Sequence, residues 1–217
     1  MKYGFIILAA LVFLTAKVFG SIQVIYTSAV IFNEFKERRK EYLLSLEALR
    51  SYQLEPWIIE ATNVSHSFFD RESARVLYPK QHDSRYSDKG INEILSIKAC
   101  LPKLQFSDDD IIIKITGRYW LYNSLFVDTI LQNPNYDVYV KDWKDLDKVV
   151  FTGCFAMKWK CFKNYIESID TEHMHRTGQI VEGVLAEFIK QDSIRTLKIE
   201  KIGMIARIHG LGQTWDL

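Results

Sequence analysis

The chain has 217 residues, a formal net charge of +1, and 48% hydrophobic and 25% charged residues. This length suits one α/β domain with a sizeable core, and the near-neutral charge gives no support to a nucleic-acid partner. No repeat, low-complexity segment or Pro/Gly/Ser linker divides the chain, so we predict a single domain over residues 21–217.

The first twenty residues have the layout of a secretory signal peptide. Lys2 precedes an apolar run from Gly4 to Ala16, and we predict cleavage after Gly20. The run is short for a membrane span, which takes about 20 residues, but a short signal anchor stays open. In both cases we expect the domain to be secreted or to lie in the lumen of the secretory pathway. A membrane contact is expected only if residues 1–20 remain as an anchor.

The next elements alternate between strands and helices. Residues 21–27 alternate weakly as a strand, residues 34–52 show helical spacing after the candidate N-cap Asn33, and residues 56–60 again favour a strand. A strand, a helix and a strand in succession form a βαβ unit. The pattern therefore predicts an α/β fold with a mostly parallel central sheet flanked by helices.

A long polar connection follows, from Ala61 to Asp88, and such connections are usually functional or mobile. A short helix is predicted after Lys89-Gly90. The acidic run 108–110 is interpreted as a solvated turn, and the β-branched run from Ile111 as a buried central strand.

The second half continues with shorter elements. Helices are predicted over 124–132, 159–169 and 179–190, and strands over 136–140, 149–151, 155–157, 197–199 and 205–208. The segment with His173 and His175 is interpreted as a polar loop. Three cysteines allow one disulfide and a free thiol, or no disulfide, and their spacing does not resemble a zinc site.

Polar residues gather where the central strand is expected to end, the edge at which ligands bind in open α/β sheets. Lys114, Arg118 and Lys89 are candidates to neutralise a diphosphate, and Gly90 is expected to precede a helix whose first amides form an anion site. Asn92 and Glu93 are candidates for hydrogen bonds to a ribose or a sugar. Two alternatives stay open, in which Glu93 is a favourable helix-terminal charge and Lys114 reaches an edge of the sheet.

The order of elements and the segment Lys114-Ile115-Thr116-Gly117-Arg118-Tyr119 resemble GT-A fold glycosyltransferases, in which this place usually carries Asp-x-Asp. The sequence is also similar to short glycosyltransferase-like proteins with Lys-x-Thr-Gly-Arg-Tyr there. The resemblance implies a nucleotide-sugar donor and a glycan or lipid-linked acceptor as partners. The donor-binding residues it implies are Thr27, Lys89, Gly90, Asn92, Glu93, Lys114, Thr116, Gly117, Tyr119 and His209.

The resemblance also implies catalytic roles. A late carboxylate at the start of a helix is expected to be the general base, with Glu182 as the candidate and Glu187 as the runner-up. Arg118 is expected to stabilise the leaving diphosphate, and Gly153 to lie on the acceptor side. Because Thr, Gly and Arg replace the metal-binding Asp-x-Asp, we predict that no metal or other cofactor is required, although a divalent metal stays possible.

Two further functions stay open from the sequence. The first is a non-catalytic carbohydrate- or nucleotide-binding protein that keeps the fold and lacks a working base. The second is a secreted hydrolase that uses Asp70 or Glu60, although no nucleophile elbow or carboxylate pairing supports it.

Overall fold

The predicted βαβ unit is present and lies at the centre of the molecule. Strand β1 (Ile22–Ser28) leads through helix α2 (Phe35–Ser51) to strand β2 (Trp57–Glu60). β1 pairs in parallel with β2 on one side and with β4 (Ile111–Thr116) on the other. The computed structural model describes residues 20–29, 35–73, 75–142, 149–208 and 213–217. The predicted leader over residues 1–19 and the candidate N-cap Asn33 lie outside these residues.

A seven-stranded sheet in the order β3-β2-β1-β4-β7-β6-β8 forms the core of the domain. Its further strands are β3 (Val76–Leu77), β6 (Val138–Lys141), β7 (Cys154–Lys158) and β8 (Thr196–Ile199). All neighbours pair in parallel except β7, which runs antiparallel to both β4 and β6. The sheet is therefore mostly parallel, as predicted.

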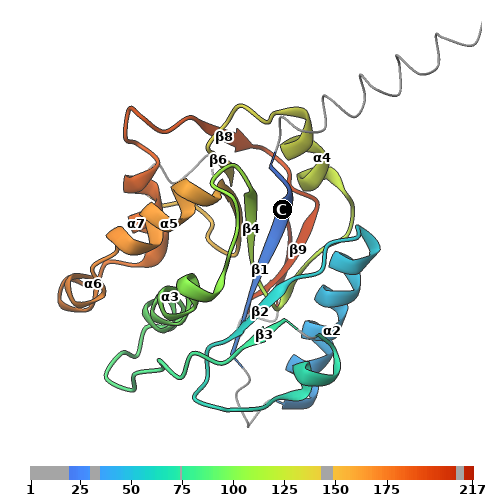
Figure 1. Cartoon of the computed structure of the whole chain (residues 1–217), viewed down its shortest axis with the longest axis vertical. Coiled ribbons are helices and arrows are strands. Elements are labelled where there is room, and N and C mark those ends of the chain that lie inside the picture. The colour runs from blue at the N-terminus through green and yellow to red at the C-terminus, as the bar shows by residue number, and fades with distance from the viewer. Residues whose placement is uncertain (1–19, 30–34, 74, 143–148, 209–212) are drawn as a thin grey trace, which may run out of the picture.

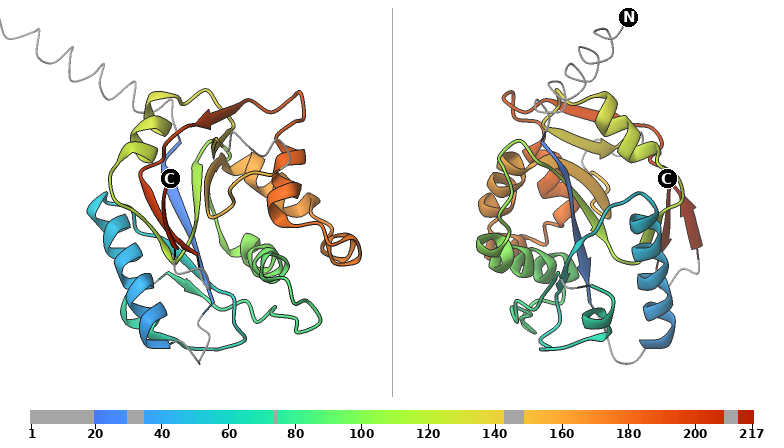
Figure 2. Two further views of the ribbon diagram at one scale, coloured as in Figure 1. Left: turned by 180° about the vertical axis from the view of Figure 1, so that it is seen from behind. Right: turned by 45° about the vertical axis from the view of Figure 1, so that its right-hand side comes forward.

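Helices cover both faces of this sheet (Figure 1). One face carries α3 (Lys89–Cys100), α5 (Trp159–Ser168), α6 (Thr171–Thr177) and α7 (Val181–Phe188), and the other carries α2 and α4 (Leu125–Gln132). Two short 3₁₀ turns, Phe68–Arg71 and Leu101–Lys103, lie in the connections. A second sheet in the order β10-β9-β5 joins Gln213–Asp216, Met204–Ile208 and Tyr119–Leu121 near α2 (Figure 2).

Strand β4 shows why the core has two halves. Its side chains alternate, so Ile111, Ile113 and Ile115 enter the hydrophobic cluster beneath α2 and α4. Ile112 enters the opposite cluster with α3, α5 and α7. Lys114, two residues further along, takes the same side as Ile112 and is the one charged side chain that β4 places in the interior.

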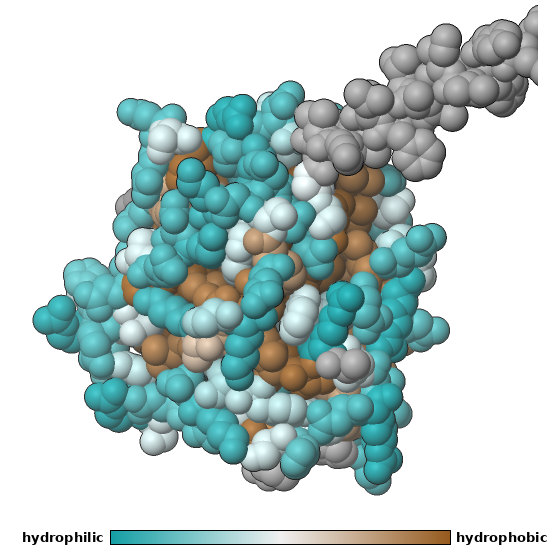
Figure 3. Space-filling model, in the orientation of Figure 1, coloured by the Kyte–Doolittle hydropathy of each residue, from teal (hydrophilic) through white to brown (hydrophobic). Residues whose placement is uncertain are grey.

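Hydrophilic side chains cover most of one face of the molecule, and hydrophobic atoms reach the surface along its central part (Figure 3).

Several predicted elements differ from the structure. No strand forms over residues 149–151, and a single strand β7 begins at Cys154. The supposed polar loop with His173 and His175 is helix α6, whose N-cap Asp170 accepts a hydrogen bond from the His173 amide at 2.9 Å. The acidic turn is solvated only in part, because Asp110 is buried and accepts hydrogen bonds from Ser21 and Ser107. Strands β3, β5 and β10 were not predicted.

Two further observations concern the whole of the described chain. None of its helices is long and apolar enough to cross a membrane. All three cysteines are free thiols, so the alternative with one disulfide is wrong.

Candidate functional site

A cavity of about 560 Å³ lies at the carboxyl ends of the parallel strands β1, β2 and β4. Because β7 runs antiparallel, its amino end and the preceding segment 151–153 reach the same edge of the sheet. The first turns of α3 and α7 complete the wall. The sheet topology therefore gathers segments from most of the chain at the edge where α/β folds bind ligands.

The cavity brings together ten of the residues singled out from the sequence. They are Thr27, Lys89, Gly90, Asn92, Glu93, Thr116, Arg118, Tyr119, Gly153 and Glu182. Lys114 and Gly117 lie behind the wall and do not line the space. His209 lies outside the described residues, and its predicted role stays a prediction. The runner-up base Glu187 lines a different cavity.

Lys114 is buried beneath the cavity, where three acceptors surround its ammonium group. Its Nζ lies 2.9 Å from Glu93 Oε1, 3.0 Å from Thr116 Oγ1 and 3.0 Å from the Thr152 carbonyl oxygen. The Thr27 hydroxyl donates to the same Glu93 oxygen. A lysine has three N–H donors, and all three have partners here. The expectation that Lys114 snorkels to an edge is therefore wrong, and its geometry favours holding Glu93 over contacting a diphosphate.

Glu182 lies at the second position of α7, with its carboxylate toward the cavity. The Thr152 hydroxyl donates to Glu182 Oε1 at 2.8 Å, which fixes one carboxylate oxygen. Thr152 thereby links two groups, since its carbonyl accepts from Lys114 and its hydroxyl holds Glu182. A continuous hydrogen-bonded network, Thr27–Glu93–Lys114–Thr152–Glu182, thus runs under the cavity from the donor-side candidates to the candidate base.

Arg118 is a cation of the cavity that the described residues leave available. Within the described parts of the chain, no hydrogen bond or ion pair joins its guanidinium to another residue. Burial raises the pKa of the Tyr119 hydroxyl, which Arg118 lowers in part and Glu93 and Glu182 raise further. The ionisation of the Tyr119 hydroxyl therefore depends on Arg118, Glu93 and Glu182, and all three charged residues line the same cavity as Tyr119.

The first turn of α3 differs from the predicted anion site. The helix begins at Lys89, so Gly90 lies inside its first turn, and the Gly90 amide donates to Asp88 Oδ1 at 2.6 Å. The carboxylate of the chain itself already caps these amides. Asn92 is also engaged, since its Oδ1 accepts from the Asp83 amide at 2.7 Å and its Nδ2 donates to the Tyr86 carbonyl at 3.1 Å. Asn92 therefore holds the loop over residues 82–88, which lines the cavity.

Gly117 and Gly153 are required by close packing. A Cβ at Gly117 would lie 2.5 Å from the Tyr26 ring, whose hydroxyl donates to the Gly117 carbonyl at 2.6 Å. A Cβ at Gly153 would lie 2.4 Å from the rings of both Phe151 and Tyr119. Each glycine thus admits an aromatic ring, and the predicted donor-side role of Gly117 and acceptor-side role of Gly153 stay predictions.

Sequence reasoning missed several cavity residues. They include Arg38, Tyr42, Tyr86 and Asp88. Tyr42 lies on α2, and its hydroxyl accepts from the Ala29 amide at 3.0 Å, which fixes the end of β1. Tyr86 donates to Glu172, which ties the loop over the cavity to α6. A buried tyrosine needs a partner for its hydroxyl, and this is the signal that points to both.

The carboxylates of the cavity do not fit a divalent metal. Glu93 is taken by Lys114 and Thr27, Glu182 by Thr152, and Asp88 by the start of α3. Across the described residues, no three His, Cys, Asp or Glu side chains come together in a way that could hold a metal ion. The hydrolase candidates are engaged as well, since buried Glu60 accepts from Ser28 and Thr62, and Asp70 accepts from Tyr78.

Neither a protein-family model nor a curated protein matches the chain. Solved structures do resemble it. The glycosyltransferase GlyE of Streptococcus pneumoniae TIGR4 superposes with a TM-score of 0.53 and 10% identity, over 84% of this chain but 45% of GlyE. A glycosyltransferase involved in the glycosylation of the major capsid of PBCV-1 gives 0.50 and 10%, over 83% of this chain and 81% of its own. At such identities the likeness establishes the fold alone, and that fold is α/β and GT-A-like.

Proposed function

We propose that this protein is a glycosyltransferase that moves a sugar from a nucleotide-sugar donor to an acceptor hydroxyl. The observation that carries the proposal is that the Arg118 guanidinium and the Glu182 carboxylate line the same cavity. The GT-A-like fold and the position of the cavity at the carboxyl ends of the strands support the same function.

The proposed reaction uses these two groups at opposite ends of the transfer. The acceptor oxygen forms a bond to the anomeric carbon while the bond from that carbon to the diphosphate breaks. The acceptor proton passes to the Glu182 oxygen that Thr152 leaves free, and the diphosphate leaves with its charge beside Arg118. A rigid guanidinium with five donors and no hydrogen-bond or ion-pair partner among the described residues suits a diphosphate.

The buried network supplies positioning in this proposal. Lys114 holds Glu93 and the Thr152 carbonyl, and so it sets the distance between the donor side of the cavity and Glu182. Glu93 lines the cavity, and we propose that its carboxylate accepts a hydrogen bond from a donor hydroxyl. We propose that the transfer needs no divalent metal, because no three possible metal ligands come together among the described residues and Arg118 stands where Asp-x-Asp would.

We also propose that the domain acts in the secretory or extracytoplasmic compartment. Cleavage after Gly20 would convert the Ser21 amide into an α-ammonium group. The Ser21 nitrogen lies 2.7 Å from Oδ1 of buried Asp110, and the Ser21 hydroxyl lies 2.8 Å from the same oxygen, so the new charge would have a partner. N-terminal sequencing of protein expressed with its own leader checks this: a start at Ser21 supports cleavage, and a retained leader supports the anchor.

A thermal-shift panel of nucleotide sugars and free nucleoside diphosphates, with and without Mn²⁺, tests the donor class. A ligand at 100 times its Kd stabilises the native state by about 2.7 kcal/mol. We expect a shift with one nucleotide family that does not depend on Mn²⁺. Arg118→Ala should weaken donor binding by roughly ten- to a hundredfold, as expected for the loss of charged hydrogen bonds. The matched control Arg71→Ala alters an exposed arginine away from the cavity and should leave binding unchanged.

Glu182→Gln separates an enzyme from a binding protein that keeps the fold. In an enzyme, turnover should fall by roughly 10²- to 10⁴-fold while the donor still binds. The control Glu167→Gln removes an exposed carboxylate on α5 and should keep full turnover. Unchanged turnover in Glu182→Gln would reject this residue as the base, and donor binding without any turnover would favour the binding protein.

A further inference from the structure

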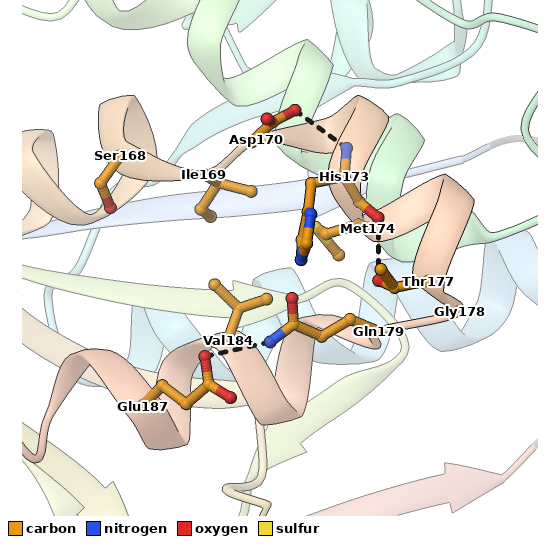
Figure 4. Close-up of a pocket in the computed structure, with 10 residues that line it drawn as sticks. All are labelled: Ser168, Ile169, Asp170, His173, Met174, Thr177, Gly178, Gln179, Val184 and Glu187. Carbon is orange, nitrogen blue, oxygen red and sulfur yellow. Dashed lines mark hydrogen bonds between the residues drawn. The ribbon is translucent and has the colours of Figure 1, made fainter.

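A second cavity of about 500 Å³ lies between the end of α5, helix α6 and the segment that leads into α7 (Figure 4). The His173 ring projects into it from α6. Gln179 and Val184 face it from the opposite side, where the Gln179 amide donates to Glu187 Oε2 at 3.1 Å. The proposed transfer uses none of these residues.

The lining chemistry suits a neutral ligand with many hydroxyl groups. Asp170, His173, Gln179 and Glu187 offer both donors and acceptors, while buried Ile169 and Met174 supply apolar surface. Its lining residues include two carboxylates and no lysine or arginine, so the lining offers a phosphate group no Lys or Arg partner. The first cavity differs, because Arg38, Lys89 and Arg118 line it. The two cavities therefore differ in the charge of their lining residues.

One short segment forms a wall of both cavities. Ile180, Val181 and Glu182 line the first, whereas Gln179 and Val184 line the second. The Ile180 side chain lines the first cavity and is 47% exposed. Gln179 lines the second cavity and Ile180 the first, so consecutive residues of the chain face the two spaces. A ligand held at the first cavity by its reacting hydroxyl is therefore close enough to extend into the second.

We propose that the second cavity binds the distal part of the acceptor, and that this acceptor is a neutral glycan of at least two sugar units. The reacting sugar lies near Glu182, the chain passes over Ile180, and the next unit places its hydroxyls against Gln179, Glu187 and His173. The proposal rests on the proposed transferase function and names its acceptor class.

Calorimetric titration of the full chain tests the cavity directly, without donor and without turnover. The probes are neutral mono-, di- and trisaccharides of matched series, chosen by first screening the protein on a printed glycan array. We expect a disaccharide to bind at least tenfold more tightly than its monosaccharide. Glu187→Ala and Gln179→Ala should each remove most of that gain, whereas Glu167→Ala, which alters a nearby exposed carboxylate outside the cavity, should keep it.

Two readouts separate this inference from the transferase proposal. Both cavity variants should keep the wild-type thermal shift with nucleoside diphosphates, which also shows that they are folded. Equal affinity for one and two sugar units, or a gain that survives in both variants, would overturn the inference while donor binding stands. A gain that is lost in both variants supports the glycan site even if no nucleotide binds.

Discussion

The most unusual residue of the fold is Lys114, a charged side chain in the middle of a buried strand. Its side chain is 3% exposed and pairs with Glu93, which is 20% exposed. Removing one partner leaves the other charge without compensation, which is more costly than losing the pair. We expect Lys114→Met to lower the free energy of unfolding by about 2 kcal/mol, because Glu93 keeps some contact with water. Urea unfolding measures the change.

The double variant Lys114→Met with Glu93→Gln gives the control. With both charges removed, the loss should be smaller than the sum of the two single losses, since no unpaired charge remains. Strict additivity would show that the two side chains do not depend on each other. Lys114 would then have to be held by Thr116 and Thr152 alone.

Thr152 has the second decisive side chain at this scale, because its hydroxyl holds Glu182. Thr152→Val keeps the shape and removes the 2.8 Å hydrogen bond to the carboxylate. We expect transfer to slow by roughly tenfold, the effect of losing one charged hydrogen bond, while donor affinity is unchanged. Thr129→Val, which removes a hydroxyl bonded within α4, is the control. Equal rates in both variants would argue against a positioning role for Thr152.

At the scale of elements, Asp137 fastens three segments at one edge of the sheet. It precedes β6, accepts two hydrogen bonds of 3.0 Å from Arg195 before β8, and lies 3.2 Å from Lys158 of β7. Burial opposes its ionisation, but Arg195 and Lys158 outweigh that effect and lower the pKa of Asp137. Its contribution to stability is therefore present above the unfolded pKa of about 3.9 and is lost as the pH falls through the lower folded value.

Asp137→Asn tests this clamp. Because Arg195 is largely exposed, we expect a loss of about 1 kcal/mol in the free energy of unfolding at pH 7. The difference from the wild type should shrink below about pH 4, where the carboxylate is protonated first in the unfolded state and then, at lower pH, in the folded state. Asp192→Asn, at an exposed carboxylate, should show no such dependence. A difference that stays constant from pH 7 to pH 3 would contradict the assignment.

Elements with a clear period could be predicted, and the others could not. The alternation in 21–27 and the β-branched run from Ile111 fixed the centre of the sheet, because burial on both faces demands such residues. The short strands β5 and β10 carry too few residues for a period. Helix α6 did carry its signals, the N-cap Asp170 and a left-handed Gly178 with φ of 71°, but its polar surface concealed them.

The same limit applies to the site. Residues could be placed at the sheet edge from strand order alone, and the cavity gathers ten of those that were chosen. The hydrogen-bond partners of these residues could not be predicted. Lys114 and Thr152 are separated by 38 positions in the sequence, and Thr27 and Glu93 by 66. Tertiary contacts of that separation leave no local pattern. The helix cap at Gly90 and the aromatic rings against Gly117 and Gly153 could not be predicted either, because these contacts form only in the packed molecule.

At the scale of the whole molecule, the core holds itself together without covalent cross-links. All three cysteines are free, in three different elements. Burial raises the pKa of the Cys154 thiol to about 12, and those of Cys100 and Cys161 to about 11. Thiol reagents attack the thiolate, which is scarce at neutral pH in all three cases. We therefore expect native protein at pH 7.5 to react very slowly with a chromogenic disulfide reagent.

In denaturant the same reagent should titrate three thiols, and a reductant should leave the midpoint of thermal unfolding unchanged. Cys161 is the least buried of the three, so any slow native reaction should disappear in Cys161→Ser. Slow labelling of the native protein, with three thiols in denaturant, would show that burial keeps the thiols reduced. The reagent and an oxidase of the expected oxidising compartment both need access to the same thiolate. Rapid labelling of a native thiol, or fewer than three thiols in denaturant, would instead reveal a disulfide or an opening of the core.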